Sequence, residues 1–375
     1  MAHALHDGYT DMIYVLLPVW QTEFGLGYGA LAMLRGIYAG TMACLQLASG
    51  RLAQRIGSRA TLALGTLLAA LGYGAAGMSG SLIGLCVALA VSGAGSSTQH
   101  PLASGAVSRV YGRDARGPLG VYNFAGDLGK AALPAALSLL LTTVAWRPAL
   151  WAMSVAGCLA AVSLALFLPT IARKGESKHQ GAAGGKHAGA PGFRLLLSIG
   201  VLDTAVRMGL LTFLPFLLRA KGLSDGMQGT ALALVFIGGA AGKFACGWLG
   251  QRVGVTGTVL VTEGATAALI LAVLWCPLMP ALVLLPILGV MLNGTSSVLY
   301  GSVPDLAAPG DTERAFAWFY TGAIASGAAA PVAYGLLGDH FGVHLATVAT
   351  AMTAVVIVPM ALVLRPYLHR AGAPA

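Results

Sequence analysis

The stretch GRLAQRIG at residues 50–57 recurs 197 positions later as GWLGQRVG at residues 247–254, so both copies share the pattern GxLxQRxG. Each copy follows a long apolar run and ends in glycine, which is typical of a tight polar turn between two helices. Several matches at offsets of 197 to 199 indicate two parallel halves of similar fold. The further matches pair Leu17 and Pro18 with Leu214 and Pro215, GSST at 95–98 with GTSS at 294–297, Tyr122 with Tyr320, and Pro134 with Pro331.

The composition indicates that both halves lie in a membrane. Of the 375 residues, 57% are apolar and 9% are charged, whereas a soluble domain carries roughly 25% charged residues. This balance excludes a disordered chain, a disulfide scaffold, a basic nucleic-acid binder and an ordinary soluble enzyme. The first apolar run carries Asp7 and Asp11 and has no Lys/Arg-rich region before it. We therefore expect a retained first span and not a cleaved signal peptide.

Apolar runs long enough to cross a bilayer, about 20 residues each, predict twelve transmembrane helices. We expect an all-α membrane protein with six-helix halves at 1–169 and 194–375. The Gly-, Ala-, Lys- and His-rich segment 170–193 between them is expected to be a flexible cytoplasmic linker. The expected spans are 4–24, 29–50, 59–78, 82–107, 117–141, 147–169, 194–218, 227–250, 257–276, 280–303, 313–337 and 342–365.

The cations outside these spans predict the orientation. When cations at span ends are counted with the adjoining loops, fifteen fall on one side and three on the other, and four of the 22 lie well inside spans. The positive-inside rule places the larger group in the cytoplasm, together with both termini and the linker. We therefore expect a multi-pass protein of the cytoplasmic (inner) membrane. The fifteen are Arg51, Arg55, Arg59, Arg109, Arg113, Arg116, Arg173, Lys174, Lys178, Lys186, Arg194, Arg252, Arg314, Arg365 and Arg370; the three are Arg147, Arg219 and Lys221.

The GxLxQRxG turns resemble the signature loop of the major facilitator superfamily, G-x-L-a-D-r-x-G-r-k. Together with the helix count and the repeat, the resemblance covers the whole chain and implies a transporter in which this loop helps to hold the cytoplasmic gate. Gln54 and Gln251 replace the acidic residue of the family pattern, while Arg55 and Arg252 remain. A plain helix turn with topology-setting cations is the alternative. The gate-loop residues so implied are Gly50, Gln54, Arg55, Gly57, Gly247, Gln251 and Arg252.

Within that superfamily, three segments are similar to the fosmidomycin-resistance group of efflux carriers. They are HDGYTD at 6–11, GSSTQHP at 95–101 and YNFAGDLGK at 122–130. The third segment departs from the group by carrying the charged residues Asp127 and Lys130, and Leu102 stands where that group commonly has an acid. The similarity implies an exporter and does not name a substrate.

Charged residues inside the expected spans are the candidates for the transport site, because each costs at least ~2.5–3.5 kcal/mol at a helix centre and usually faces a partner or a water-filled cavity. Asp127 and Lys130 are three positions apart and Asp203 and Arg207 are four apart, so each pair is able to meet on one helix face. The alternative is that these pairs only neutralise each other. We predict a substrate and proton pathway formed by Asp11, Arg35, His100, Asp127, Lys130, Asp203 and Arg207.

Three other ionisable residues are assigned away from that pathway. Asp7 is expected at the cytoplasmic mouth, where a helix N-terminus favours an acid. Glu263 falls in the expected ninth helix, which is peripheral in the resembled fold, and is expected to be structural. Lys243 is expected to snorkel toward the interface.

The sequence predicts no metal and no cofactor. The five cysteines form no CxxC pair and are read as small packing residues. His340 and His344 are four positions apart without a third ligand in sight. The chain has no Walker sequence and no GxGxxG after a strand, so ATP is not the expected energy source.

The function predicted from these features is secondary active transport and not catalysis: proton-coupled export (antiport) of a small polar or anionic compound by alternating access, with substrate bound between the halves. Arg and Lys within the membrane favour an anionic substrate. The expected partners are that substrate, protons and the lipid bilayer, with no nucleic acid, and the expected state is a monomer. Two alternatives remain: proton-coupled uptake of an organic or inorganic anion, and a membrane-embedded enzyme or receptor.

Overall fold

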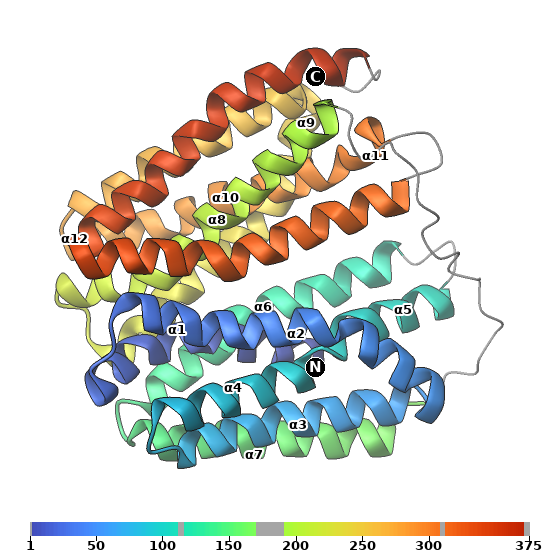
Figure 1. Ribbon diagram of the computed structural model, residues 1–375, viewed down its shortest axis with the longest axis vertical. Coiled ribbons are helices and arrows are strands. Elements are labelled where there is room, and N and C mark those ends of the chain that lie inside the picture. The colour runs from blue at the N-terminus through green and yellow to red at the C-terminus, as the bar shows by residue number, and fades with distance from the viewer. Residues whose placement is uncertain (1, 112–115, 170–190, 308–311, 371–375) are drawn as a thin grey trace. The chain divides into compact units, whose positions relative to one another are not determined.

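A computed structural model describes residues 2–111, 116–169, 191–307 and 312–370, and in these ranges the chain forms helices and no strand (Figure 1). Contacts divide the chain into two units, which are described separately. Unit 1 is Met1–Gly175 with Gly222–Ala233, and unit 2 is Glu176–Lys221 with Leu234–Ala375. Residues 170–190 of the expected linker lie outside the described ranges, and residues 191–193 begin a helix of unit 2.

Seven helices form most of unit 1. Helix α1 packs along α6, and α3 packs along both α4 and α7. Their bounds are α1 Ala2–Phe24, α2 Tyr28–Ile56, α3 Ser58–Met78, α4 Leu82–Ser96, α5 Gln99–Tyr111, α6 Arg116–Leu140 and α7 Trp146–Phe167.

Unit 2 contains longer helices. Helix α8 packs mainly against α12, and also against α10. The bounds are α8 Pro191–Ala220, α9 Asp225–Trp275, α10 Leu278–Gly301, α11 Val303–Leu306 and α12 Thr312–Arg370, with the first residues of α9 belonging to unit 1.

Two glycines divide the two longest helices, α9 and α12, and this division explains why the number of helices is smaller than the number of expected spans. Gly254 inside α9 has φ 74° and Gly342 inside α12 has φ 85°, so each helix consists of two segments. Glycine adopts positive φ without the steric cost that other residues meet. Eight described helices are long and apolar enough to cross a membrane. Counting α9 and α12 twice and adding the more polar α1 and α6 gives the twelve spans that the sequence predicts.

The expected fourth span, 82–107, differs from prediction because it is interrupted. Helix α4 ends at Ser96 and α5 begins at Gln99. Pro101 removes a backbone donor and its ring clashes with the carbonyl four residues earlier, which disfavours a continuous helix. The hydroxyls of Ser97 and Thr98 instead donate to the carbonyls of Ala94 and Gly95. His100 lies directly after this interruption, in the first turn of α5.

Small residues allow α1 and α6 to approach closely. A Cβ added at Gly8 would lie 2.7 Å from the carbonyl oxygen of Gly129, and one added at Gly129 would collide with the backbone of Ala4. Close approach at glycine is a common way for membrane helices to pack, because lipid supplies no hydrophobic force between them. The charged residues of both helices are thereby brought together.

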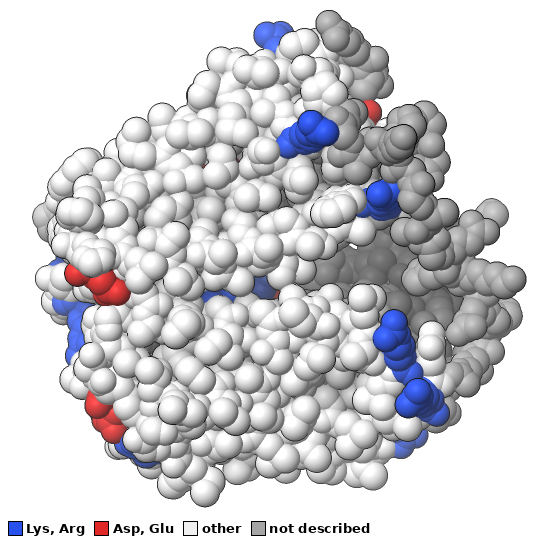
Figure 2. Space-filling view, viewed as in Figure 1, with Lys and Arg blue, Asp and Glu red and all other residues white. Residues whose placement is uncertain are grey.

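The outer surface is apolar, as a lipid-facing surface requires. On α7 the exposed side chains Trp151, Val155, Leu159, Val162 and Leu166 recur every three or four residues and form one stripe. Figure 2 shows a broad uncharged face on which Lys, Arg, Asp and Glu lie mainly toward the two ends. Among the exposed charges, Arg147 Nη1 donates to Glu23 Oε1 at 2.8 Å.

Candidate functional site

Asp7 is the centre of a buried polar cluster in unit 1. Its two carboxylate oxygens face different partners: Oδ2 lies 3.2 Å from Lys130 Nζ on α6, and Oδ1 lies 3.6 Å from His3 Nδ1 and 3.5 Å from His100 Nε2. Asp7 is 5% exposed. We call His3, Asp7, His100, Asp127 and Lys130 the Asp7 cluster.

Lys130 lies between two acids. Its ammonium is 3.2 Å from Asp7 Oδ2 and 3.7 Å from Asp127 Oδ1, so the pairing expected from the three-residue spacing on α6 occurs. The Lys130 side chain is 32% exposed, against 7% for Asp7 and 11% for Asp127. Lys130 is therefore the most exposed of the three Lys and Asp side chains, while His100, at 46%, is the most exposed member of the cluster.

Aromatic and backbone contacts hold the imidazole of His3 in place. Its ring stacks on Tyr122 with centroids 3.8 Å apart and meets His100 edge-on at 5.2 Å. A Cβ added at Gly126 would lie 2.5 Å from His3 Nε2 and 2.6 Å from Asp7 Oδ2. Glycine at 126 thus leaves the space that these two side chains fill.

The sequence interpretation missed two members of this cluster. Asp7, which the sequence assigns to the cytoplasmic mouth as a helix-end acid, is buried and joins α1, α5 and α6. His3 was not considered. The available signal was the i, i+4 spacing of His3 and Asp7, which puts both on one helix face.

A neutral polar network continues from the cluster along α1. His6 hydrogen-bonds with Thr66 at 2.9 Å and with Ser96 at 3.3 Å. Ser96 also bonds with Tyr38 at 2.7 Å. These contacts connect α1 to α2, α3 and α4, and they fix the rotation of α1 about its axis.

The predicted residues Asp11 and Arg35 lie one turn beyond this network. Asp11 is 6% exposed and Arg35 is 5% exposed, and the two interact electrostatically. The guanidinium carbon of Arg35 lies 5.5 Å from the ring centroid of Tyr14. Unit 1 therefore buries a second acid–base pair, joining α1 to α2.

Unit 2 contains the counterpart, in which a serine hydroxyl joins the predicted pair on α8. Ser296 on α10 donates to Asp203 Oδ2 at 2.8 Å and accepts from Arg207 Nη1 at 3.0 Å. Asp203 is 3% exposed, and Arg207 is partly buried. We call Asp203, Arg207, Glu263 and Ser296 the Asp203 cluster. The repeat signal GTSS at 294–297 contains Ser296, but the predicted site omitted it.

Glu263, to which the sequence assigns a structural role, lies in the Asp203 cluster. It lies on the second segment of α9, is 2% exposed, and its carboxyl is a hydrogen-bonding neighbour of the Asp203 carboxyl. Among the described residues its Oε2 has no hydrogen-bond partner. Two buried carboxyls this close repel each other when both are ionised.

The expected gate loops form tight turns in both units. Gly57, which ends the first copy, has φ 88°, and Gly254 in the second has φ 74°. Gly50 and Gly247 have open space around the position of a Cβ. Arg55 lines a cavity of about 470 Å³, whereas Arg252 stacks over Trp248 with 4.2 Å to the ring centroid. The cations in the linker and at 109, 113, 116 and 370 lie outside the residues whose side chains are described.

One group of described residues has the ligand types of a metal site. Atoms of His3, Asp7 and His100 lie within 4.8 Å of one another. The neighbouring Lys130 ammonium already supplies a positive charge to Asp7. Lys130 therefore competes with any metal ion for the Asp7 carboxylate.

Comparisons with known proteins agree with this architecture. The family model of the Major Facilitator Superfamily matches the chain at residues 1–202 and again at 196–374. None of the curated proteins matches the sequence closely enough to count as a relative.

Several solved structures have the same fold. The inward-facing, occupied structure of a bacterial homologue of the human lysosomal transporter Spinster has a TM-score of 0.82 at 16% identity, covering 99% of this chain and 96% of that one. The unoccupied structure of that homologue has a TM-score of 0.83, with the same identity and coverage. A variant of the nucleoside transporter NupG has a TM-score of 0.80 at 11% identity, covering 97% of this chain and 98% of that one.

Proposed function

Since the chain belongs to the major facilitator superfamily, we propose that it is a proton-coupled exporter of a small polar or anionic compound that works by alternating access. The observation that carries this proposal is the Lys130 ammonium held between the carboxylates of Asp7 and Asp127 on membrane-spanning helices. A structural ion pair needs one acid for one base. Here the cation has two acids, and one of them is available for exchange.

The exchange links an anion to a proton. A carboxylate or phosphonate group that binds Lys130 competes with Asp7 for the same ammonium. A carboxylate that loses its cation in a poorly hydrated site takes up a proton, because burial disfavours its charged form. Asp7 can then pass that proton to His100 or His3, whose ring nitrogens lie 3.5 and 3.6 Å from Oδ1. Substrate release restores the Asp7–Lys130 pair and releases the proton. Because anion and proton are bound together in this exchange, it also supports the second candidate function, uptake by proton symport; export by antiport requires that the two occupy the cluster in alternate half-cycles.

The Asp203 cluster supports a second acid–base exchange of the same kind. Ser296 uses one hydroxyl for both Asp203 and Arg207, so a substrate anion that binds Arg207 leaves Ser296 free to serve Asp203 alone. Among the described residues Arg207 Nε has no hydrogen-bond partner, and it offers a donor to such an anion. Besides Asp7, the acids proposed to bind and release a proton are Asp127 and Asp203, with Asp11 as a third candidate.

The proposed orientation follows from the cations at helix ends. Arg51, Arg55 and Arg59 lie around the first GxLxQRxG turn, and the positive-inside rule assigns this side to the cytoplasm. Both termini would share it in a protein with twelve spans. The membrane proposed is the cytoplasmic membrane, with the protein acting as a monomer.

Proton flux tests the proposal directly. Purified protein in liposomes containing a pH-sensitive dye would be exposed to a panel of small carboxylates and phosphonates, fosmidomycin among them. We expect at least one compound to change the internal pH, and Lys130→Ala to abolish that response. The control is Lys221→Ala, since Lys221 donates to the Leu274 and Cys276 carbonyls away from both clusters. Equal flux in Lys130→Ala and wild type would contradict the proposed site.

Direction is tested with oriented membranes. Right-side-out and inverted vesicles would be compared under an imposed pH gradient. An exporter driven by proton antiport should accumulate the active compound in inverted vesicles with an acidic interior and not in right-side-out vesicles. Accumulation in right-side-out vesicles driven by external acid would instead identify uptake by proton symport.

A further inference from the structure

The two copies of GxLxQRxG differ at one position in a way that changes their surfaces. The second residue is Arg51 in the first copy and Trp248 in the second. In the second copy Arg252 lies over the Trp248 ring at 4.2 Å, which is a cation–π contact. In the first copy this aromatic partner is replaced by another cation, so Arg51 and Arg55 stand one helical turn apart at the end of α2.

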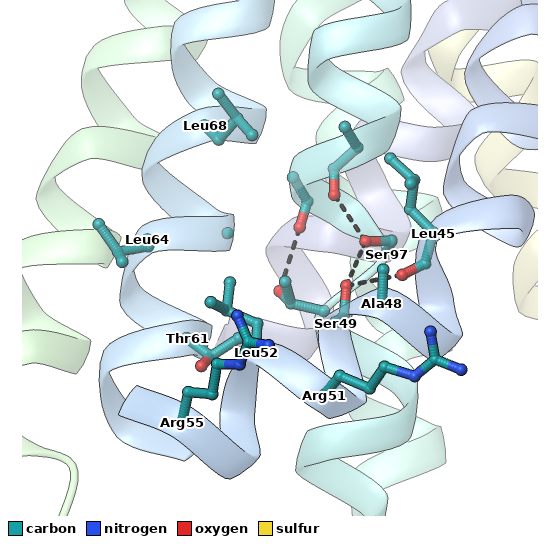
Figure 3. A pocket seen from close by; sticks show the side chains of 14 residues that line it. Leu45, Ala48, Ser49, Arg51, Leu52, Arg55, Thr61, Leu64, Leu68 and Ser97 are labelled. Atoms are coloured by element: carbon teal, nitrogen blue, oxygen red, sulfur yellow. Dashed lines mark hydrogen bonds between the residues drawn. The ribbon is translucent and has the colours of Figure 1, made fainter. Parts of the chain in front are cut away.

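A cavity adjoins these two arginines. It has a volume of about 470 Å³ and lies between the ends of α2, α3 and α4, with Arg51 and Arg55 among its lining residues (Figure 3). Both arginine side chains are exposed. Among the described residues neither has a carboxylate within salt-bridge distance, and the intervening Gln54 is neutral. The mouth of the cavity therefore carries two positive charges without an internal counter-charge.

The hydroxyl groups that line the inner part of the cavity already have hydrogen-bond partners within the protein. Ser49 and Ser97 hydrogen-bond with each other at 2.6 Å, as the dashed lines in Figure 3 show. Ser97 donates to the Ala94 carbonyl at 2.6 Å and Thr98 to the Gly95 carbonyl at 3.1 Å. These hydroxyls therefore need no ligand. The groups that a ligand would complement are the positive charges at the mouth of the cavity, which favour an anion.

The walls are apolar and continue outward. Leu64 and Leu68 on α3 are 52% and 41% exposed, and Leu52 on α2 is 42% exposed. Leu64 and Leu68 are four residues apart, so they lie above one another on one face of α3 and extend from the cavity along the helix. A small inorganic anion would leave this apolar surface uncovered, whereas an acyl chain would pack against it.

We propose that this cavity binds an anionic phospholipid, with the phosphate on Arg51 and Arg55 and one acyl chain along Leu64 and Leu68. Basic pockets between transmembrane helices on the cytoplasmic side are suited to anionic lipid headgroups. The proposed orientation determines only which leaflet supplies the lipid, here the cytoplasmic one. It does not depend on the proposed substrate or on proton coupling.

Binding to the delipidated full-length protein tests the proposal. Phosphatidylglycerol and phosphatidylcholine of equal chain length would be titrated in detergent, with bound lipid counted by native mass spectrometry and stability followed by thermal unfolding. We expect phosphatidylglycerol to bind about tenfold more tightly than phosphatidylcholine. Equal binding of the two lipids would overturn the proposal.

Variants locate the site. Arg51→Trp copies the second loop into the first and, because Arg55 then has a ring to stack on, it should remove the preference for phosphatidylglycerol. Arg51→Lys/Arg55→Lys keeps both charges and should retain most of the preference, which shows that the loop still folds. The matched control is Arg252→Ala in the second copy, which should leave binding unchanged. An equal loss in Arg252→Ala and Arg51→Trp would mean general surface attraction and would reject the cavity.

A final arm separates lipid from soluble anion. Inorganic phosphate and glycerol phosphate should stabilise the protein only weakly at concentrations where short-chain phosphatidylglycerol has saturated it. If either protects as well as the lipid, and Arg51→Trp abolishes that protection, the cavity is a soluble-anion site and the lipid proposal is wrong. Proton flux is not measured in these experiments, so their failure leaves the transport proposal unaffected.

Discussion

Lys130 Nζ on α6 lies 3.2 Å from Asp7 Oδ2 on α1, and this ion pair joins two helices whose backbones are brought together by Gly8 and Gly129. The pair is unequal, because Lys130 is 32% exposed and the Asp7 side chain only 7%. An ion pair that is open on its cationic side can admit an anion without first breaking the helix packing. The predictions below test this arrangement and its counterpart in unit 2.

Replacing Asp7 should separate its electrostatic role from packing. Asp7→Asn keeps the shape of the side chain but leaves Lys130 with Asp127 alone. We expect a destabilisation of about 2–3 kcal/mol, less than for a fully buried broken pair because Lys130 is partly solvated. The double variant Asp7→Asn/Lys130→Met should recover part of this loss in thermal unfolding. Additive losses in the double variant would mean that the two residues do not interact energetically.

Ser296→Ala removes the hydroxyl that serves both Asp203 and Arg207. We expect a loss of about 1–3 kcal/mol, since one buried acceptor and one donor lose a partner together. Substrate-dependent proton flux should fall as well. Ser326→Ala is a suitable control: that hydroxyl also bonds to α8, donating to the Val201 carbonyl at 2.6 Å, but it touches neither charge. If both variants lower flux equally, the Ser296 bridge has no special role.

Neutral variants of the acids proposed to carry the proton should fold, and at least one should differ from wild type in how substrate movement is coupled to a pH gradient. Asp127→Asn and Asp203→Asn are each expected to insert and to purify as monomers, because removing a buried charge eases insertion. At least one should lose the ability of a pH gradient to drive substrate movement while still exchanging substrate across the membrane. Full gradient-driven transport in both single variants and in the double variant would exclude these acids from coupling.

The α1–α6 contact should not tolerate a methyl group. Gly129→Ala places a Cβ against the Ala4 backbone, where no flexible side chain can yield. We expect a cost of about 1–3 kcal/mol from overpacking, with a matching loss of transport as the Asp7–Lys130 distance grows. Gly264→Ala on α9 faces open space and should be neutral or slightly stabilising in the same unfolding measurement. A neutral Gly129→Ala would contradict the packing described.

The architecture was predictable from sequence because its causes are local. An apolar run long enough to cross a bilayer must form a helix to satisfy its own backbone, and the glycines of GxLxQRxG mark the turns. The repeat of that pattern predicted two halves, and the family match over both parts of the chain confirms the fold. Pairs on one helix were also accessible: Asp127 and Lys130 meet as their spacing predicts.

Only the tertiary structure determines which charged residues on different helices come into contact. His100 on α5 contacts Asp7 on α1, and the α1–α6 glycines bring Lys130 to the same carboxylate. Glu263 meets Asp203 only because the second segment of α9 lies beside α8 and α10 at that level. Hydropathy and spacing report how each helix sits in the membrane and which residues share its face. They carry no information on its rotation against a neighbour, because that is set by side-chain packing between segments far apart in the chain.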